Sequence, residues 1–194
     1  MASLTPSDLL SLEEYARERG VFRARVLEHK KRRQLAVGPS TTWCFEDRLT
    51  IQYQVQEMLR AERIFEPEGI AEELASYNPL IPDGTNWKVT LLIEFPDPEE
   101  RARQLATLKG IERRCWVQAA GASRVYAIAD EDLERENAEK TSSVHFLRFE
   151  LTPPMIARLK SGGALALGID HECYRHAIDP VPEPVRSALA ADLA

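Results

Sequence analysis

The feature that most limits the fold is an order of strand, proline-capped helix and strand that occurs twice in the second half of the chain. In the first copy, alternating apolar residues predict a strand over 87–95, and Asp97-Pro98-Glu99-Glu100 predicts the start of a helix. That helix ends near Gly110, and a second strand follows over 114–119. A helix of this length can return along its strand, so the pattern predicts a crossover between parallel strands.

The second copy has a strand over 144–151, a helix after Thr152-Pro153-Pro154 and a strand over 164–170. Together the two copies predict an α+β fold whose mixed, mostly antiparallel sheet contains ferredoxin-like split β-α-β units. Three further segments complete this half: a strand over 123–129 that pairs with 114–119, a loop or short helix over 130–140, and a closing helix over 182–194.

The first half begins with a helical arm. Ser11-Leu12-Glu13-Glu14 is a capping box, and apolar residues then recur at spacings of three and four as far as about Gln34. The glycine at position 20 is expected to divide this arm into two helices. Positive charges at Lys30-Lys31-Arg32-Arg33 fit the end of the second helix.

Strict alternation follows, with apolar Leu49, Ile51 and Tyr53 separated by polar residues. This period predicts a hairpin with strands over 42–46 and 49–53, followed by a helix from about 54 to 65. Another helix is expected from Pro67 to Tyr77.

Residues that interrupt helices and strands are concentrated between 78 and 86, where we expect the main internal boundary of the chain. It separates the arm, hairpin and helices of residues 1–78 from the strand-helix-strand units of 87–194. A chain of 194 residues, 44% of them hydrophobic, can bury one good core. We therefore expect a single domain over 1–194.

Three widely spaced cysteines without a C-x-x-C motif argue against disulfides and against a four-thiolate metal site, and they are typical of a reducing compartment. The sequence has no signal-peptide pattern and no apolar run of membrane-spanning length. These features predict a cytoplasmic protein that does not interact with membranes. The net charge of −6 argues against general attraction to polyanions.

The densest group of reactive side chains follows the last strand of the second copy, over 170–176. His171, Cys173 and His176 are ligand types that a transition metal prefers, and Asp170 could orient an imidazole. Polar residues after a strand more often form a solvated loop without metal, and we expect such a loop here. As a catalytic site, the same segment would use His171 as general base and Asp170 as its orienting group.

His145 is the distant histidine that could complete such a site, with Arg148 or Arg175 as a binder of anions. If the strands over 144–151 and 164–170 are parallel, His145 and His171 lie at opposite ends, about 20 Å apart. If the two strands are antiparallel, these histidines could meet. The basic arm gives a further alternative, a nucleic-acid surface, although no aromatic stacking pattern accompanies it.

Ten segments together resemble one bacterial family, the domain-of-unknown-function family 3501. They are Leu9-Leu10-Ser11-Leu12-Glu13-Glu14-Tyr15, Lys31-Arg32-Arg33, Gly38, Phe45-Glu46, Gln54-Val55-Gln56-Glu57-Met58-Leu59-Arg60, Tyr77-Asn78, Leu92-Ile93-Glu94, Val144-His145-Phe146-Leu147-Arg148-Phe149, Gly168-Ile169-Asp170-His171 and Tyr174. The resemblance covers nearly the whole chain. Cys173 lies outside the family pattern, which favours a metal site of His145 and His171 over one that uses the thiol.

The resemblance brings no catalytic residues and no established cofactor, but it implies genomic association with rubrerythrin-type proteins and an iron-sulfur oxidoreductase. It therefore implies a non-enzymatic accessory or binding protein of peroxide or redox metabolism, with one of those redox proteins as partner. The alternative is a metal-binding protein or enzyme whose site surrounds Asp170 and His171.

Overall fold

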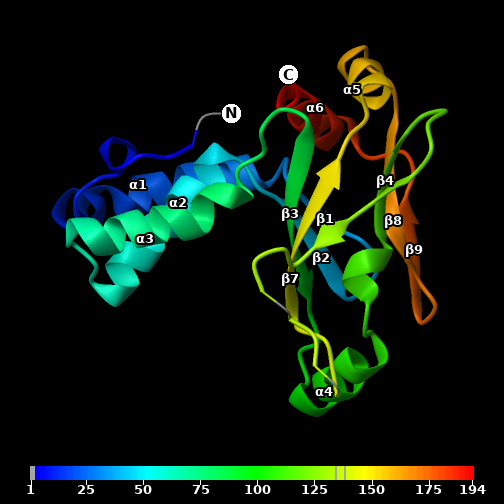
Figure 1. Ribbon diagram of the computed structural model, residues 1–194, viewed down its shortest axis with the longest axis horizontal. Coiled ribbons are helices and arrows are strands. Elements are labelled where there is room, and N and C mark those ends of the chain that lie inside the picture. The colour runs from blue at the N-terminus through cyan, green and yellow to red at the C-terminus, as the bar shows by residue number, and fades with distance from the viewer. Residues whose placement is uncertain (1–2, 134, 138) are drawn as a thin grey trace.

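Two antiparallel sheets face each other in the computed structural model, which describes residues 3–133, 135–137 and 139–194 (Figure 1). The first sheet has the strand order β1 (Gln34–Ala36), β2 (Thr41–Phe45), β3 (Asn86–Ile93), β7 (Val144–Glu150) and β6 (Ile128–Ala129). The second sheet has the order β5 (Val125–Tyr126), β4 (Cys115–Ala119), β8 (Leu165–His171) and β9 (Tyr174–Ile178). The helices are α1 (Leu12–Lys30), α2 (Arg48–Glu62), α3 (Pro67–Tyr77), α4 (Pro98–Thr107), α5 (Pro153–Lys160) and α6 (Glu183–Ala191).

The expected α+β class, mostly antiparallel pairing and helical arm are confirmed, and both strand-helix-strand units are present. The parallel pairing within each unit was wrong. β3 and β4 belong to different sheets, as do β7 and β8, because α4 and α5 carry the chain from one sheet to the other at opposite ends of the molecule (Figure 1). The two units are joined instead by antiparallel pairing of β3 with β7, from Asn86↔Glu150 to Leu92↔Val144.

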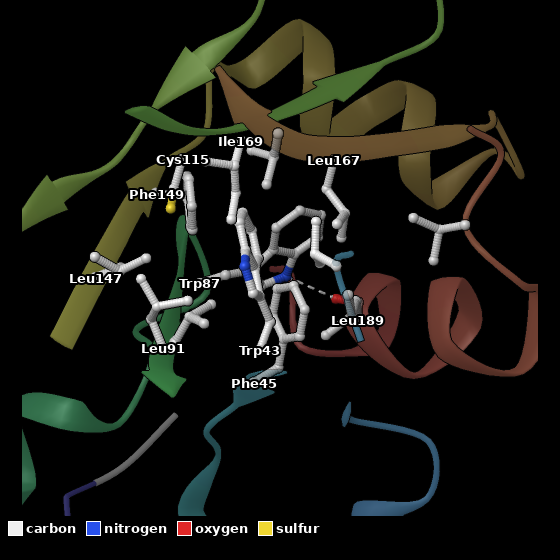
Figure 2. Packing of buried hydrophobic residues seen from close by; sticks show 14 of the residues in the cluster. Trp43, Phe45, Trp87, Leu91, Cys115, Leu147, Phe149, Leu167, Ile169 and Leu189 are labelled. Atoms are coloured by element: carbon white, nitrogen blue, oxygen red, sulfur yellow. Dashed lines mark hydrogen bonds between the residues drawn. The ribbon is translucent and has the colours of Figure 1, made fainter. Parts of the chain in front are cut away.

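The main core fills the space between the sheets. Alternation along β3 buries Trp87, Val89, Leu91 and Ile93 on the face that meets the second sheet. Trp43 and Phe149 stack there, with ring centroids 5.5 Å apart, and Leu167 and Ile169 of β8 belong to the same core (Figure 2). The apolar period of these strands therefore determines which residues face the second sheet and which face outward.

The helical arm is one uninterrupted helix up to Lys30, so the division at Gly20 was wrong. Gly20 is exposed, and a Cβ atom built on it would meet nothing within 4 Å. A single exposed glycine weakens a helix by only about 0.5–1 kcal/mol, which the strong capping box at Ser11 and Glu14 can offset.

The second strand of the predicted hairpin, over 49–53, was also wrong, because these residues form the first turns of α2. Asp47 caps this helix by accepting a hydrogen bond from the backbone of Thr50 at 2.9 Å. Ile51, Val55 and Leu59 are buried at a spacing of four, which is the helical period. The predicted strand over 42–46 corresponds to β2, which pairs with β1 and β3 instead.

Most of the remaining predicted elements are confirmed. The helices after Pro67, Asp97 and Thr152 are present, as is the closing helix α6. The strand over 123–129 is divided between the sheets: β5 pairs with β4 as expected, whereas β6 pairs with β7. Residues 130–140 are irregular where described, and positions 134 and 138 lie outside the described residues.

α1, α2 and α3 lie together on the side of the first sheet that faces away from the second sheet (Figure 1). This helical layer has its own small core, which consists of Leu4, Ile51, Val55, Leu59, Leu74 and Ile81. Glu46 connects it to the sheet, since its two carboxylate oxygens accept hydrogen bonds from Thr50 of α2 and Thr90 of β3, both at 2.6 Å. Among the described residues, no helix is both long and apolar enough to cross a bilayer.

A buried ion cluster joins the end of the arm to the C-terminal segment. The guanidinium of Arg33, whose side chain is 5% exposed, donates two hydrogen bonds to Asp192 at 2.8 and 2.6 Å. Its Nε lies 2.8 Å from Asp47, which His29 also contacts at 2.6 Å. The last residue of the predicted basic run is thus part of the interior rather than of a solvated helix end.

Candidate functional site

The segment 170–176, expected to be a loop, is a β-hairpin in which β8 continues to His171 and β9 begins at Tyr174. Successive residues of a strand point to opposite faces, so Asp170 and His171 are directed apart. Asp170 accepts hydrogen bonds from Arg124 and Tyr126, the latter at 3.0 Å. His171 is 6% exposed, and its Nε2 lies 3.0 Å from the carbonyl of Lys109. Backbone groups, not Asp170, therefore orient this imidazole.

The proposed metal ligands of the hairpin have different surroundings. Cys173 is exposed at the turn, and its backbone N–H donates to Nδ1 of His171 at 3.2 Å. The ring of His176 packs on Tyr174, with centroids 4.5 Å apart. Within residues 3–133, 135–137 and 139–194, no group of three or more histidine, cysteine or acidic side chains is placed to hold a metal ion.

His145 and Arg148 lie on opposite faces of β7. The imidazole of His145 is completely buried, with Nδ1 2.6 Å from Asp130 and Nε2 2.9 Å from the hydroxyl of Thr141. His145 belongs to the first sheet and His171 to the second, and each is engaged by its own partners. Arg148 faces away from the core, so the structure does not join these residues into one site. Their catalytic roles stay predictions.

A cleft of about 540 Å³ lies between the helical layer, at α2 and α3, and the outer face of the first sheet. We call it the arm–sheet cleft. Met58 of α2 and Tyr77 of α3 line its helical wall, and Lys88, Phe146 and Arg148 line its sheet wall. Glu131, Asp132 and Arg135 close one side. Ligand sites are usually concave, mostly apolar and provided with a few polar groups, and this cleft has those properties.

Two of the three cations in the cleft are neutralised by carboxylates. Arg148 donates two hydrogen bonds to Glu131, both at 2.8 Å, and also contacts Glu150. Arg135 pairs in the same bidentate way with Asp132 at 2.6 and 2.7 Å. These planar pairs fix the position of both guanidinium groups. The Arg135 guanidinium also covers the ring of Phe146, 4.6 Å from its centroid.

Lys88 and Glu73, on opposite walls, are not neutralised in this way. The ammonium of Lys88 has no carboxylate of a described residue within 4.0 Å, and Oε2 of Glu73 is buried without a hydrogen-bond partner among the described residues. Burial and the neighbouring Arg148 lower the pKa of Lys88. Burial, followed by the charges of Glu62 and Glu72, raises the pKa of Glu73. The cleft therefore shifts both groups toward their uncharged forms.

Sequence reasoning missed this cleft, although one signal was present. The alternation that buries Trp87, Val89 and Leu91 places Lys88 on the opposite face of the same strand. It could not show that α2 and α3 cover that face, since the segment over 49–53 had the period of a strand.

A family model and a solved structure match this chain over nearly its whole length. The model of the family described as "Protein of unknown function (DUF3501)" matches residues 3–193. The chain belongs to this family. A crystal structure of a novel protein of unknown function from Burkholderia pseudomallei K96243 has 49% sequence identity and a TM-score of 0.95, with 100% of both chains covered. A search of curated proteins gave no match.

The DUF3501 fold explains one residue of the motif Gly168-Ile169-Asp170-His171. A Cβ atom at Gly168 would lie 2.5 Å from the carbonyl oxygen of His176 and 2.7 Å from the indole of Trp116. Gly168→Ala is therefore expected to lower the free energy of unfolding by about 1–3 kcal/mol, because the backbone of β9 cannot move away freely. Urea denaturation followed by circular dichroism measures the change.

Gly20→Ala is the matched control, because this helical glycine has open space around it. It is expected to stabilise the protein by about 0.4–1 kcal/mol. Equal stabilities for the two alanine variants would contradict the close packing of Trp116 and the β9 backbone against Gly168.

Proposed function

We propose that this DUF3501 protein is a non-enzymatic binding protein, and that the arm–sheet cleft holds a small organic molecule. The observation that carries the proposal is the buried oxygen of Glu73 that has no partner among the described residues, on the wall opposite Lys88, in a cleft whose remaining charges are paired. A buried polar atom without a partner destabilises the folded state by about 1–3 kcal/mol unless something satisfies it. A bound molecule that hydrogen-bonds Glu73 would supply the missing partner.

The shape of the occupant follows from the lining. Met58, Tyr77, Leu80 and Phe146 offer apolar and aromatic surface, which suits a flat or aliphatic body. Polar atoms at two ends of the molecule would meet Lys88 and Glu73. The ligand we expect is therefore amphipathic and small enough to fit about 540 Å³.

Filling the cleft tests the proposal. Ser76 is exposed on α3 and lines the cleft, and its hydroxyl contacts only the preceding turn, at the carbonyl of Glu72. Ser76→Trp should abolish retention of the ligand without opening a cavity in either core. Untagged protein would be purified from cells, denatured, and its released small molecules compared by mass spectrometry.

Ser187→Trp is the matched control, since Ser187 is an exposed helical serine far along the chain whose hydroxyl also contacts the preceding turn. We expect the same compound to be enriched at least tenfold in the native protein and in Ser187→Trp relative to Ser76→Trp. If no compound distinguishes Ser76→Trp from the other two proteins, the cleft is not a ligand site.

The family resemblance supports a more specific context, in which the binding protein serves peroxide or redox metabolism beside a rubrerythrin-type or iron-sulfur partner. We carry this context forward as a proposal about the partner. Native purification of the unmodified protein, Ser76→Trp and Ser187→Trp also tests the proposed partner. A specific partner protein would be recovered with each of the three in a constant ratio of partner to purified protein.

A further inference from the structure

The environment of Lys88 points to chemistry beyond noncovalent binding. Lys88 of β3 and Arg148 of β7 are direct cross-strand partners, so both side chains lie on the same outer face of the first sheet. The Cβ atoms of such partners are about 4.5–5.5 Å apart, and like charges in these positions repel each other. Two cations are thus held side by side on one wall of the arm–sheet cleft.

The surrounding carboxylates favour Arg148 rather than Lys88. Glu131 and Glu150 both contact the Arg148 guanidinium, and the ammonium of Lys88 has no carboxylate of the described residues within ion-pairing distance. Glu131, Asp83 and Glu150 attract the ammonium from farther away, but burial and Arg148 outweigh them and lower the pKa of Lys88. A desolvated lysine beside a second cation is the usual arrangement of a nucleophilic amine.

We propose that Lys88 is a carbonyl-reactive amine and that the arm–sheet cleft takes an aldehyde or ketone as an imine. The inference rests on the proposed function, because it names the chemical class of the cleft's occupant. The lone pair of Nζ attacks the carbonyl carbon, the carbonyl oxygen gains a proton, and the resulting carbinolamine loses water. Amine and carbonyl give imine and water, so the step needs no oxidant or reductant.

Glu73 fits the same chemistry from the opposite wall. One of its carboxyl oxygens is buried without a partner in the described part of the chain, and burial raises its pKa, so this group holds a proton more readily than a free carboxyl and suits the transfer to the departing water. We assign it to that transfer within the cleft.

Reductive trapping tests the proposal. The purified protein would be incubated with benzaldehyde and cyanoborohydride at pH 7.5, and N-benzylation would be mapped by mass spectrometry at its six lysines. Because the neutral fraction of an amine at a given pH rises as its pKa falls, Lys88 should react faster than the exposed Lys31 and Lys160. A rate at Lys88 no higher than theirs overturns the proposal.

Two variants separate specific reactivity from accessibility. Arg148→Gln removes the neighbouring cation and releases Glu131 and Glu150, so benzylation of Lys88 should slow by about threefold or more. Arg103→Gln, which removes an exposed guanidinium paired with Glu100 on α4, should leave the rate unchanged. Equal effects of the two substitutions would contradict the role of Arg148.

The result is independent of the ligand comparison with Ser76→Trp. Slow trapping at Lys88 overturns imine formation even if the cleft retains a compound. Fast trapping at Lys88, with no compound retained, overturns the proposed binding function and leaves the amine chemistry intact.

Discussion

Arg33→Met is expected to lower the free energy of unfolding by about 3–5 kcal/mol, because it removes the cation from a buried ion cluster. The Arg33 guanidinium lies between Asp47 and Asp192, and each of the three side chains is less than a tenth exposed. Methionine fills similar volume but leaves both carboxylates without their cation. Guanidinium chloride denaturation, followed by circular dichroism at pH 7, measures the change.

Arg32→Met provides the control at the neighbouring position, where the side chain is exposed. Its expected effect is within about 0.5 kcal/mol of zero. A triple variant, Arg33→Met with Asp47→Asn and Asp192→Asn, should recover part of the lost stability, since amides do not carry the uncompensated charge. Equal stability of Arg33→Met and Arg32→Met would show that the cluster contributes nothing.

Arg33 also shows what the basic run of the arm could and could not reveal. The pattern Lys30-Lys31-Arg32-Arg33 predicts positive charge at a helix end, and Lys31 does lie exposed in an ion pair with Glu28. Nothing local distinguishes Arg33 from its neighbours. Its partner Asp192 lies 159 residues away, so its burial depends on where the last helix packs.

The second half of the chain was predictable because its signals are local. Proline at the first helical position, an acidic first turn and strict apolar alternation each act within a few residues, and α4, α5, β3 and β7 all formed where these signals lie. The pairing partners are a nonlocal property. Because β3 pairs with β7 rather than with β4, the sheets separate and the expected parallel crossovers disappear.

The geometry of the candidate site could not be predicted from the sequence for the same reason, because contacts between side chains are also nonlocal. The reactive residues over 170–176 are adjacent in sequence, but the β8–β9 hairpin directs Asp170 and His171 to opposite faces. Nothing in the local sequence distinguishes Lys88 or Glu73. Their environment arises because β3 and α3, which carry them, line the same cleft. In segment 49–53 both periods were present, and the cap at Asp47 together with burial of Ile51 decided in favour of a helix.

Trp87→Ala is the second large effect that we expect, with a loss of about 3–5 kcal/mol in the free energy of unfolding. The Trp87 side chain is 1% exposed and lies in the middle of the core between the sheets. Its indole N–H donates to the carbonyl of Leu189 at 3.0 Å, which attaches α6 to β3 (Figure 2). Alanine removes both the packed volume and this hydrogen bond. The same denaturation experiment measures the loss.

Trp87→Phe separates these two contributions, because phenylalanine keeps an aromatic ring but cannot donate to Leu189. It should lower stability by about 1–3 kcal/mol, less than alanine does. Since Trp87 and Arg33 both hold the C-terminal segment, through Leu189 and Asp192, Trp87→Phe and Arg33→Met should combine to less than their sum. Strict additivity would mean that α6 remains docked in each single variant and that the two contacts act independently.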